Sequence, residues 1–214
     1  LESVLAKFYE ANGTEKMAKV NSLKMKASVN LQGMAIDQDL SFKRPNKMRT
    51  DMNMMGQDMV MIYDGKEAYM KTPGATTFSS MPKSQSAGMI SRADFDGALY
   101  NYKDKGNKVT LKGQETVGDK KFYVLNVVQK GLEDTPSDWL IDAESYLLTY
   151  QRMEMNIQGM EMNAETELSN YKEFNGVMIP TKIVTKASGM EMMSMEMKDI
   201  QFDPQISDDI FVVE

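Results

Sequence analysis

Residues 22–43 read SLKMKASVNLQGMAIDQDLSFK and decide the fold. From Leu23 to Leu31 apolar residues alternate with polar ones, which is the pattern of a strand with one face in solvent. Gly33 then supplies a turn, and the alternation resumes from Met34 to Lys43. Two strands joined by so short a connection can only pair antiparallel, so the stretch predicts a β-hairpin.

The same alternation recurs along most of the chain. It is found at 47–55, 57–63, 67–71, 108–112, 121–129, 137–141, 146–157, 160–171, 177–185 and 190–202. About eleven strands are therefore predicted. So many strands with one apolar face must curl, because their twist accumulates. We expect an α+β fold in which a strongly curved antiparallel sheet, an unclosed half-barrel, carries a helical lid.

Two segments interrupt the strand pattern and are expected to be helical. At the N-terminus the residues Leu1, Val4, Leu5, Phe8 and Tyr9 form one apolar helical stripe, which Gly13 ends, and a second short helix is expected at 14–20. Between 72 and 99 the chain is rich in Pro, Ser, Gly and Ala, and Pro82 is well placed to open a short helix through Ile90 to Phe95. We interpret 1–214 as one domain: an N-terminal helix (1–20), strands (21–71), a lid segment (72–99) and strands (100–214).

Composition argues against several classes of function. The net charge of −6 is spread along the chain, so no basic stripe for nucleic acid is present. Cysteine and histidine are both absent, which removes disulfides, thiolate or imidazole metal ligands and histidine-dependent triads. Carboxylate pairs such as Asp94 with Asp96, or Asp208 with Asp209, lie in turn-like settings and are interpreted as solvated charges. We predict no enzyme activity, no cofactor and no nucleic-acid partner.

Methionine is the outlier, with 22 residues where about five would be usual for this length. Many are spaced by two, as in Met52 and Met54 or Met59 and Met61, and so share one face of a strand. Three interpretations stay open. The methionines replace Leu, Ile and Val in the core, they line an adaptable apolar cavity, or they bind Cu(I) through soft thioethers.

Several short motifs resemble the LolA/LolB-like lipoprotein carriers of the bacterial envelope. They are FKRPNKM at 42–48, YDGK at 63–66 with Tyr69 and Pro73, WLID at 139–142 leading into Tyr146-Leu147, and Tyr171-Lys172 with NGV at 175–177 and Pro180. The resemblance implies a half-barrel under a helical lid, with an apolar cavity that receives acyl chains. It also implies that Arg44 bonds to the lid as a latch, although the Ser- and Gly-rich lid segment departs from the family pattern.

From these patterns we predict a periplasmic or envelope-associated lipid or lipoprotein carrier, exported by a signal peptide that is not part of this sequence. Its partners would be acyl chains of lipoproteins or other lipids, together with envelope membrane proteins. The predicted cavity residues are Met25, Val29, Leu40, Met52, Met54, Met59, Met61, Tyr123, Leu125, Met153 and Met155, and the lid residues are Val4, Leu5, Phe8, Met89, Ile90 and Phe95. The alternatives are a sensory or protein-interaction domain with a filled core, and a Cu(I)-binding envelope protein.

Overall fold

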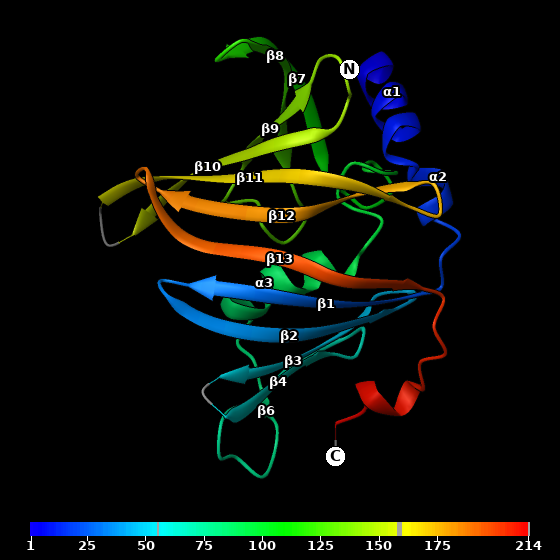
Figure 1. Cartoon of the computed structure of the whole chain (residues 1–214), viewed down its shortest axis with the longest axis vertical. Coiled ribbons are helices and arrows are strands. Elements are labelled where there is room, and N and C mark those ends of the chain that lie inside the picture. Colours follow the sequence, from blue (N-terminus) through cyan, green and yellow to red (C-terminus); the bar gives the residue numbers. More distant parts are fainter. Residues whose placement is uncertain (55, 158–159, 214) are drawn as a thin grey trace. The chain divides into compact units, whose positions relative to one another are not determined.

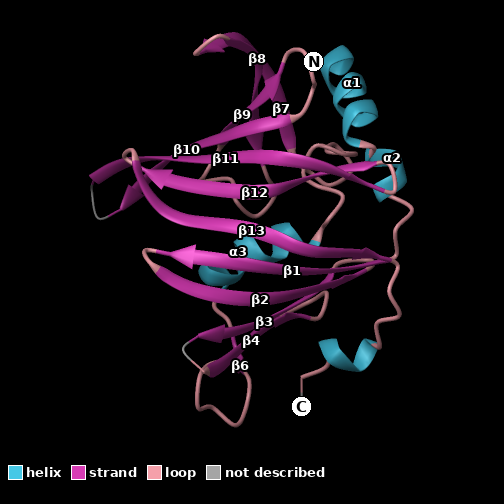
Figure 2. Cartoon of the chain, in the orientation of Figure 1, coloured by secondary structure: helices cyan, strands magenta, loops and turns pink. Residues whose placement is uncertain are grey.

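The computed structural model describes residues 1–54, 56–157 and 160–213. Its helices are α1 (Glu2–Asn12), α2 (Thr14–Met17), α3 (Lys83–Ala93) and the 3-10 helix η1 (Asp208–Phe211). Its strands are β1 (Ser22–Leu31), β2 (Met34–Lys43), β3 (Lys47–Met54), β4 (Gln57–Tyr63), β5 (Ala68–Lys71), β6 (Ser79–Ser80), β7 (Lys108–Val117), β8 (Lys120–Val128), β9 (Ser137–Asp142), β10 (Leu148–Ile157), β11 (Met160–Phe174), β12 (Val177–Ala187) and β13 (Met190–Phe202). Strands dominate the chain (Figure 2).

The strands form one open antiparallel sheet with the order β6-β5-β4-β3-β2-β1-β13-β12-β11-β10-β9-β8-β7. The predicted α+β class, with an open antiparallel sheet and few helices, is confirmed. The sheet has thirteen strands where about eleven were expected. The two-residue strand β6 lies in the expected lid segment and is too short to give an alternating pattern. Met55, which the alternation placed at the end of a strand, lies outside the described residues.

The chain forms two compact units. Unit 1 comprises Leu1–Ala18 and Ala98–Ser194, and unit 2 comprises Lys19–Gly97 and Met195–Glu214. No helix in the described ranges is long and apolar enough to cross a membrane. Each unit has a hydrophobic core of its own.

In unit 1 the sheet and α1 share one core. Leu5 of α1 packs in one cluster with side chains from four successive strands, Val109, Leu125, Trp139 and Leu148. Leu99 and Tyr102 of the loop before β7 belong to the same cluster. A smaller cluster, Phe122, Val124 and Leu140, alternates with these residues and occupies the other face.

Gly13 explains why α1 ends where the sequence predicts. Its φ of +65° is left-handed, and its N–H caps the helix at the carbonyl of Glu10. A side chain at this position would also collide with the carbonyl oxygen of Gly176 in the β11–β12 turn. Glycine is therefore required both by the backbone conformation and by the close approach of the two turns.

In unit 2 the sheet curls around α3 (Figure 1). The helical residues Met89 and Ala93 are buried in a cluster to which all of β1–β5 contribute, with Leu23, Leu40, Phe42, Met48, Tyr63 and Ala68 as the strand members. Pro82 precedes the helix as its N-cap residue. The sequence expectation of a helix opened by Pro82 is met, although the helix runs over Lys83–Ala93 and ends before Phe95.

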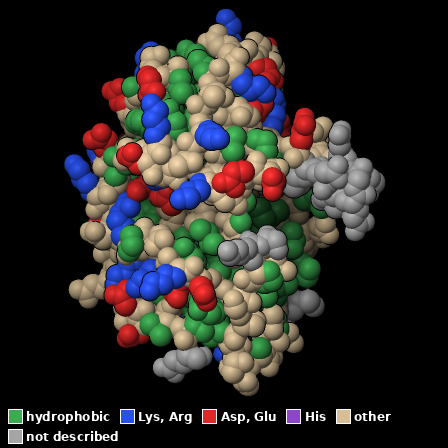
Figure 3. Space-filling model, turned by 180° about the vertical axis from the view of Figure 1, so that it is seen from behind, with side chains coloured by type: hydrophobic (Ala, Val, Ile, Leu, Met, Phe, Trp, Pro, Cys, Tyr) green, Lys and Arg blue, Asp and Glu red, His purple; other side chains and the backbone are tan. Residues whose placement is uncertain are grey.

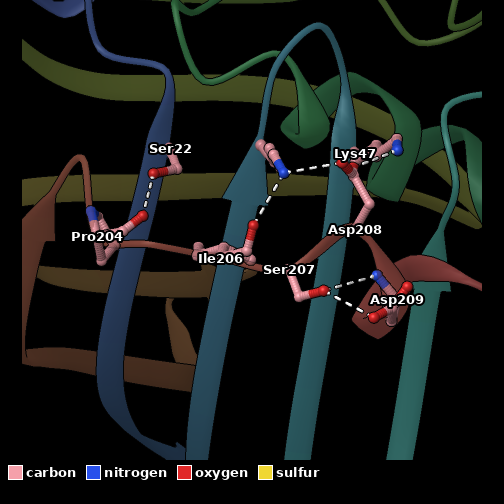
Figure 4. A network of polar contacts seen from close by, with 8 residues as sticks. Ser22, Lys47, Pro204, Ile206, Ser207, Asp208 and Asp209 are labelled. Atoms are coloured by element: carbon pink, nitrogen blue, oxygen red, sulfur yellow. Dashed lines mark hydrogen bonds and ion pairs between the residues drawn. The ribbon is translucent and has the colours of Figure 1, made fainter.

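The C-terminal segment folds back onto β1–β3 instead of adding a strand (Figure 4). Lys43 Nζ donates to the carbonyl of Ile206 at 2.8 Å, and Asp208 accepts from both Lys43 and Lys47 at 3.0 and 2.7 Å. Ser207 caps η1 by accepting from the N–H of Asp209, and Phe211 is almost fully buried. This segment thus belongs to the core of unit 2.

Candidate functional site

The face of the unit 2 sheet that packs against α3 is apolar and rich in methionine. Strand register places Met25 opposite Leu40, Met52 opposite Met59, and Thr50 between Leu40 and Met61. Residues opposite one another across a strand pair share a face. We call this surface the inner face of unit 2. It carries Leu23, Met25, Val29, Leu40, Met48, Thr50, Met52, Met54, Met59 and Met61.

The predicted cavity residues of unit 2 therefore lie on one face. They are Met25, Val29, Leu40, Met52, Met54, Met59 and Met61. Val29, Leu40 and Met52 are buried, whereas the other four are half-buried. Such half-buried apolar side chains are available to solvent in part, and Figure 3 shows hydrophobic side chains reaching the surface beside charged ones.

The lid residues predicted in 72–99 differ in their surroundings. Met89 is 2% exposed within the inner-face cluster, and Phe95 packs against the same cluster. Ile90 is 38% exposed. Because α3 fills the space over the inner face with Met89 and Ala93, a ligand could occupy that space only after α3 moves.

Of the predicted residues of unit 1, Leu125 belongs to the cluster that contains Leu5 of α1, and Tyr123 packs against that cluster. Tyr123 and Leu125 of β8 lie opposite Ile141 and Trp139, and Met153 lies opposite Ser137. Of the lid residues in α1, Leu5 and Phe8 pack in this cluster and Val4 is 5% exposed. The side chain of Met155 lies outside the described part of the chain.

Arg44 joins the strand turn to the end of the lid segment. Its guanidinium donates two hydrogen bonds to Asp96, at 2.7 and 2.6 Å, and a third to the carbonyl of Val20 at 2.6 Å. It also lies 4.6 Å from the ring centre of Phe95. The hydrogen bond to Asp96 is the main cause that raises the pKa of Arg44, so the guanidinium stays charged. This geometry matches a latch, whose role stays a prediction.

Sequence reasoning missed two residues of this region. Asp96 was taken as a solvated turn carboxylate, yet its side chain is only 12% exposed and pairs with Arg44. Thr50 was not singled out, although its hydroxyl is the one buried side-chain polar atom without a hydrogen-bond partner in the described ranges. Alternation alone shows that Thr50 shares a face with Met52, and that was the available signal.

Three surface depressions in the described part of the chain are lined mainly by charged and amide side chains. Two lie in unit 2 and one in unit 1. Charged linings of this kind do not suit an acyl chain, because its burial removes apolar area from water without satisfying polar groups. The apolar surface beneath α3 is thus the better candidate site.

Comparisons with known proteins agree with the fold. No family model matches the sequence, and no curated protein matches it significantly. Among solved structures, a LolA superfamily protein from Nitrosomonas europaea superposes with a TM-score of 0.69 at 15% identity, over 99% of this chain and 96% of the other. The chain has a LolA-like fold. The resemblance that FKRPNKM and the other short motifs indicated is confirmed for the fold.

Two further structures share the LolA-like fold. A protein of the DUF1329 family from Desulfovibrio piger gives a TM-score of 0.65 at 13% identity, with 98% and 97% of the two chains covered. A putative outer membrane lipoprotein-sorting protein domain from Vibrio parahaemolyticus gives 0.63 at 11% identity, with 95% of each chain covered. The likeness extends over nearly the whole chain, which includes both units.

Proposed function

We propose that this chain is a carrier that binds an acyl chain of a lipid or lipoprotein between α3 and the inner face of unit 2. The observation that carries the proposal is the row of apolar, half-buried side chains, Met25, Met59 and Met61 among them, on a curled sheet with a LolA-like fold. We extend it to Tyr123, Leu125 and Met153, which share one face of the unit 1 sheet, as a further apolar contact surface. The Vibrio relative's description as a lipoprotein-sorting domain supports a place in the cell envelope.

The free energies involved suit reversible binding of an acyl chain. Each buried methylene of a ligand contributes about 0.8 kcal/mol, so an acyl chain can bind without directional contacts. This gain is offset by the loss of the contacts that Met89 and Ala93 make in the closed state, in which α3 lies on the inner face. Met side chains have three rotatable bonds and can repack around ligands of different shape. Selectivity would then depend on the length and bulk of the chain and on the opening of α3.

Substituting methionine by glutamine tests the site with little change in side-chain length. We expect Met25→Gln/Met61→Gln to weaken binding of a fluorescent fatty acid by about tenfold or more, because two amides must be desolvated on the apolar face. The matched control is Met34→Gln/Met190→Gln, whose positions are 43% and 67% exposed. Circular dichroism checks that both variants are folded. Equal binding by all three proteins would contradict the proposed site.

A second candidate is a protein-interaction domain with a permanently filled core. The tight burial of Met89 and Ala93, at 2% and 0% exposure, favours it. Under this alternative α3 never leaves the inner face, and wild-type protein would take up neither fatty acid nor lipopeptide. The fatty-acid titration of the wild type therefore separates the two functions.

A further inference from the structure

Four methionines of unit 2 lie together on the inner face at the β3–β4 hairpin. Met52 and Met59 are directly opposite one another, and Met54 and Met61 follow two residues along each strand. All four therefore share a face. We call Met52, Met54, Met59 and Met61 the methionine patch. No stretch of leucine or isoleucine interrupts it, so thioether sulfur is the dominant chemistry of this surface.

Sheet geometry brings Met52, Met59 and either Met54 or Met61 within reach of a common point, because Met54 and Met61 lie on opposite sides of the Met52–Met59 pair. Opposite residues have Cβ atoms about 4.5–5.5 Å apart, and diagonal neighbours are about 7–8 Å apart. A flexible methionine side chain spans such gaps, so three sulfurs can converge on one ion. The side chain of Gln38 already shows a sulfur acting as an acceptor, since its Nε2 donates to Met52 Sδ at 3.3 Å.

Ions can reach the patch from solution. Met54, Met59 and Met61 are half-buried, so solvent reaches part of each of these side chains. The aspartates of the same two strands, Asp51 and Asp58, alternate with the methionines and therefore lie on the opposite face of the sheet. In the described ranges no cluster of three or more His, Cys, Asp or Glu could hold a metal ion. A hard cation thus has little to recognise here, whereas a soft one has several sulfurs.

We propose that the methionine patch is a binding site for one Cu(I) ion, coordinated by three of its four thioethers. Thioethers are soft ligands that select Cu(I) over Zn(II) and other harder ions. The chain has neither cysteine nor histidine to compete for the metal. This inference goes beyond lipid carriage and does not depend on it.

Leucine substitutions separate the metal site from the apolar surface. The variant Met52→Leu/Met54→Leu/Met59→Leu/Met61→Leu keeps the apolar character and nearly the volume of each side chain but removes every sulfur of the patch. The matched control is Met17→Leu/Met34→Leu/Met178→Leu/Met190→Leu, with one substitution each in α2, β2, β12 and β13. Both variants and the wild type are titrated anaerobically with the Cu(I)–bicinchoninate complex, and the transfer of one equivalent is measured.

We expect the wild type and the control to take one Cu(I) from the chelator with equal affinity, and the patch variant to bind at least about tenfold more weakly. Zn(II) should not be retained by any of them. The proposal is overturned if the wild type extracts no Cu(I), if the patch variant binds as well as the wild type, or if Zn(II) binds equally. Fatty-acid binding by the patch variant should remain within a few-fold of the wild type, so failure of this site and failure of the carrier function are distinguishable.

Discussion

Thr50 carries a buried hydroxyl that no other described group satisfies. The residue is 3% exposed and lies between Leu40 and Met61 on the inner face. A buried polar atom without a partner costs about 1–3 kcal/mol in desolvation. Thr50 therefore weakens the closed state of unit 2.

Replacing this hydroxyl by a methyl group should stabilise the protein. Valine has the same shape and also favours strands, so Thr50→Val is expected to raise the free energy of unfolding by about 1 kcal/mol. The matched control is Thr181→Val, because Thr181 is also buried but donates to the carbonyl of Asn170 at 2.6 Å. That variant should lose stability. Urea unfolding measures both, and a loss of stability in Thr50→Val would show that its hydroxyl has a partner.

Individual residues also show which contacts cannot be predicted from the sequence. The apolar members of the inner face follow from alternation, because a period of two fixes which side chains share a face. The hydrogen-bond and ion-pair partners of polar residues cannot be predicted from alternation. Arg44 and Asp96 are 52 positions apart, and nothing local to either residue specifies that they meet. Asp96 could be placed only once the lid segment had been folded onto the strand turn.

Among the elements, α3 and the lid segment depend most on contacts far apart in the sequence. Arg44 anchors the end of the segment through Asp96 and Phe95. We expect Arg44→Leu to speed hydrogen exchange in α3, by an amount corresponding to about 1.5–3 kcal/mol for a charged hydrogen-bonded pair. Arg152→Leu is the control, since Arg152 forms comparable ion pairs with Glu115 and Glu165 in unit 1.

The latch prediction has a second readout in ligand binding. Weakening the closed state should make the inner face more accessible, so Arg44→Leu should take up fatty acid faster than the wild type. If neither the exchange of α3 nor the uptake of fatty acid changes, Arg44 is a structural residue of the turn and not a latch.

Helix α1 is tied to the loop before β7 by Tyr9, whose hydroxyl donates to the carbonyl of Leu99 at 2.6 Å. Burial raises the pKa of Tyr9 from 10.0 to about 12. A pKa raised on folding gives stability that is complete below pH 10 and is lost as the pH rises through 12.

Removing this hydroxyl should alter alkaline unfolding. We expect Tyr9→Phe to be about 1 kcal/mol less stable at neutral pH, through loss of the hydrogen bond. Its stability should fall less steeply than that of the wild type between pH 10 and 12. The control Tyr100→Phe leaves the bond to Leu99 intact. Identical pH profiles for wild type and Tyr9→Phe would contradict this role of Tyr9.

Element boundaries were predictable where one pattern dominated. The hairpin of β1 and β2 follows from residues 22–43, and Gly13 ends α1 as expected. Two elements escaped prediction, and a third was predicted too short. β6 has two residues, η1 has four, and β7 continues past Lys112 to Val117. The first two are too short to show a period, and the register shift in β7 between Leu111 and Gly113 breaks the alternation that would have extended it.

In the molecule as a whole, the methionines link the fold to the two proposed functions, lipid binding and Cu(I) binding. A sheet built on leucine and isoleucine would pack more rigidly around α3, whereas methionine adapts to a changing occupant. The same residues offer sulfur to Cu(I). Lipid binding depends on their apolar surface and metal binding on their thioethers, and Met→Leu against Met→Gln substitutions distinguish the two.

We propose that the molecule carries an acylated ligand. Native mass spectrometry of protein purified from the envelope of its own host tests this most directly, with the mass compared before and after denaturation. We predict a non-covalent adduct that is released on denaturation and that lipid analysis identifies as an acylated molecule. Protein that emerges without an adduct, and that also refuses added fatty acid and lipopeptide, would contradict the carrier function and favour a filled-core interaction domain.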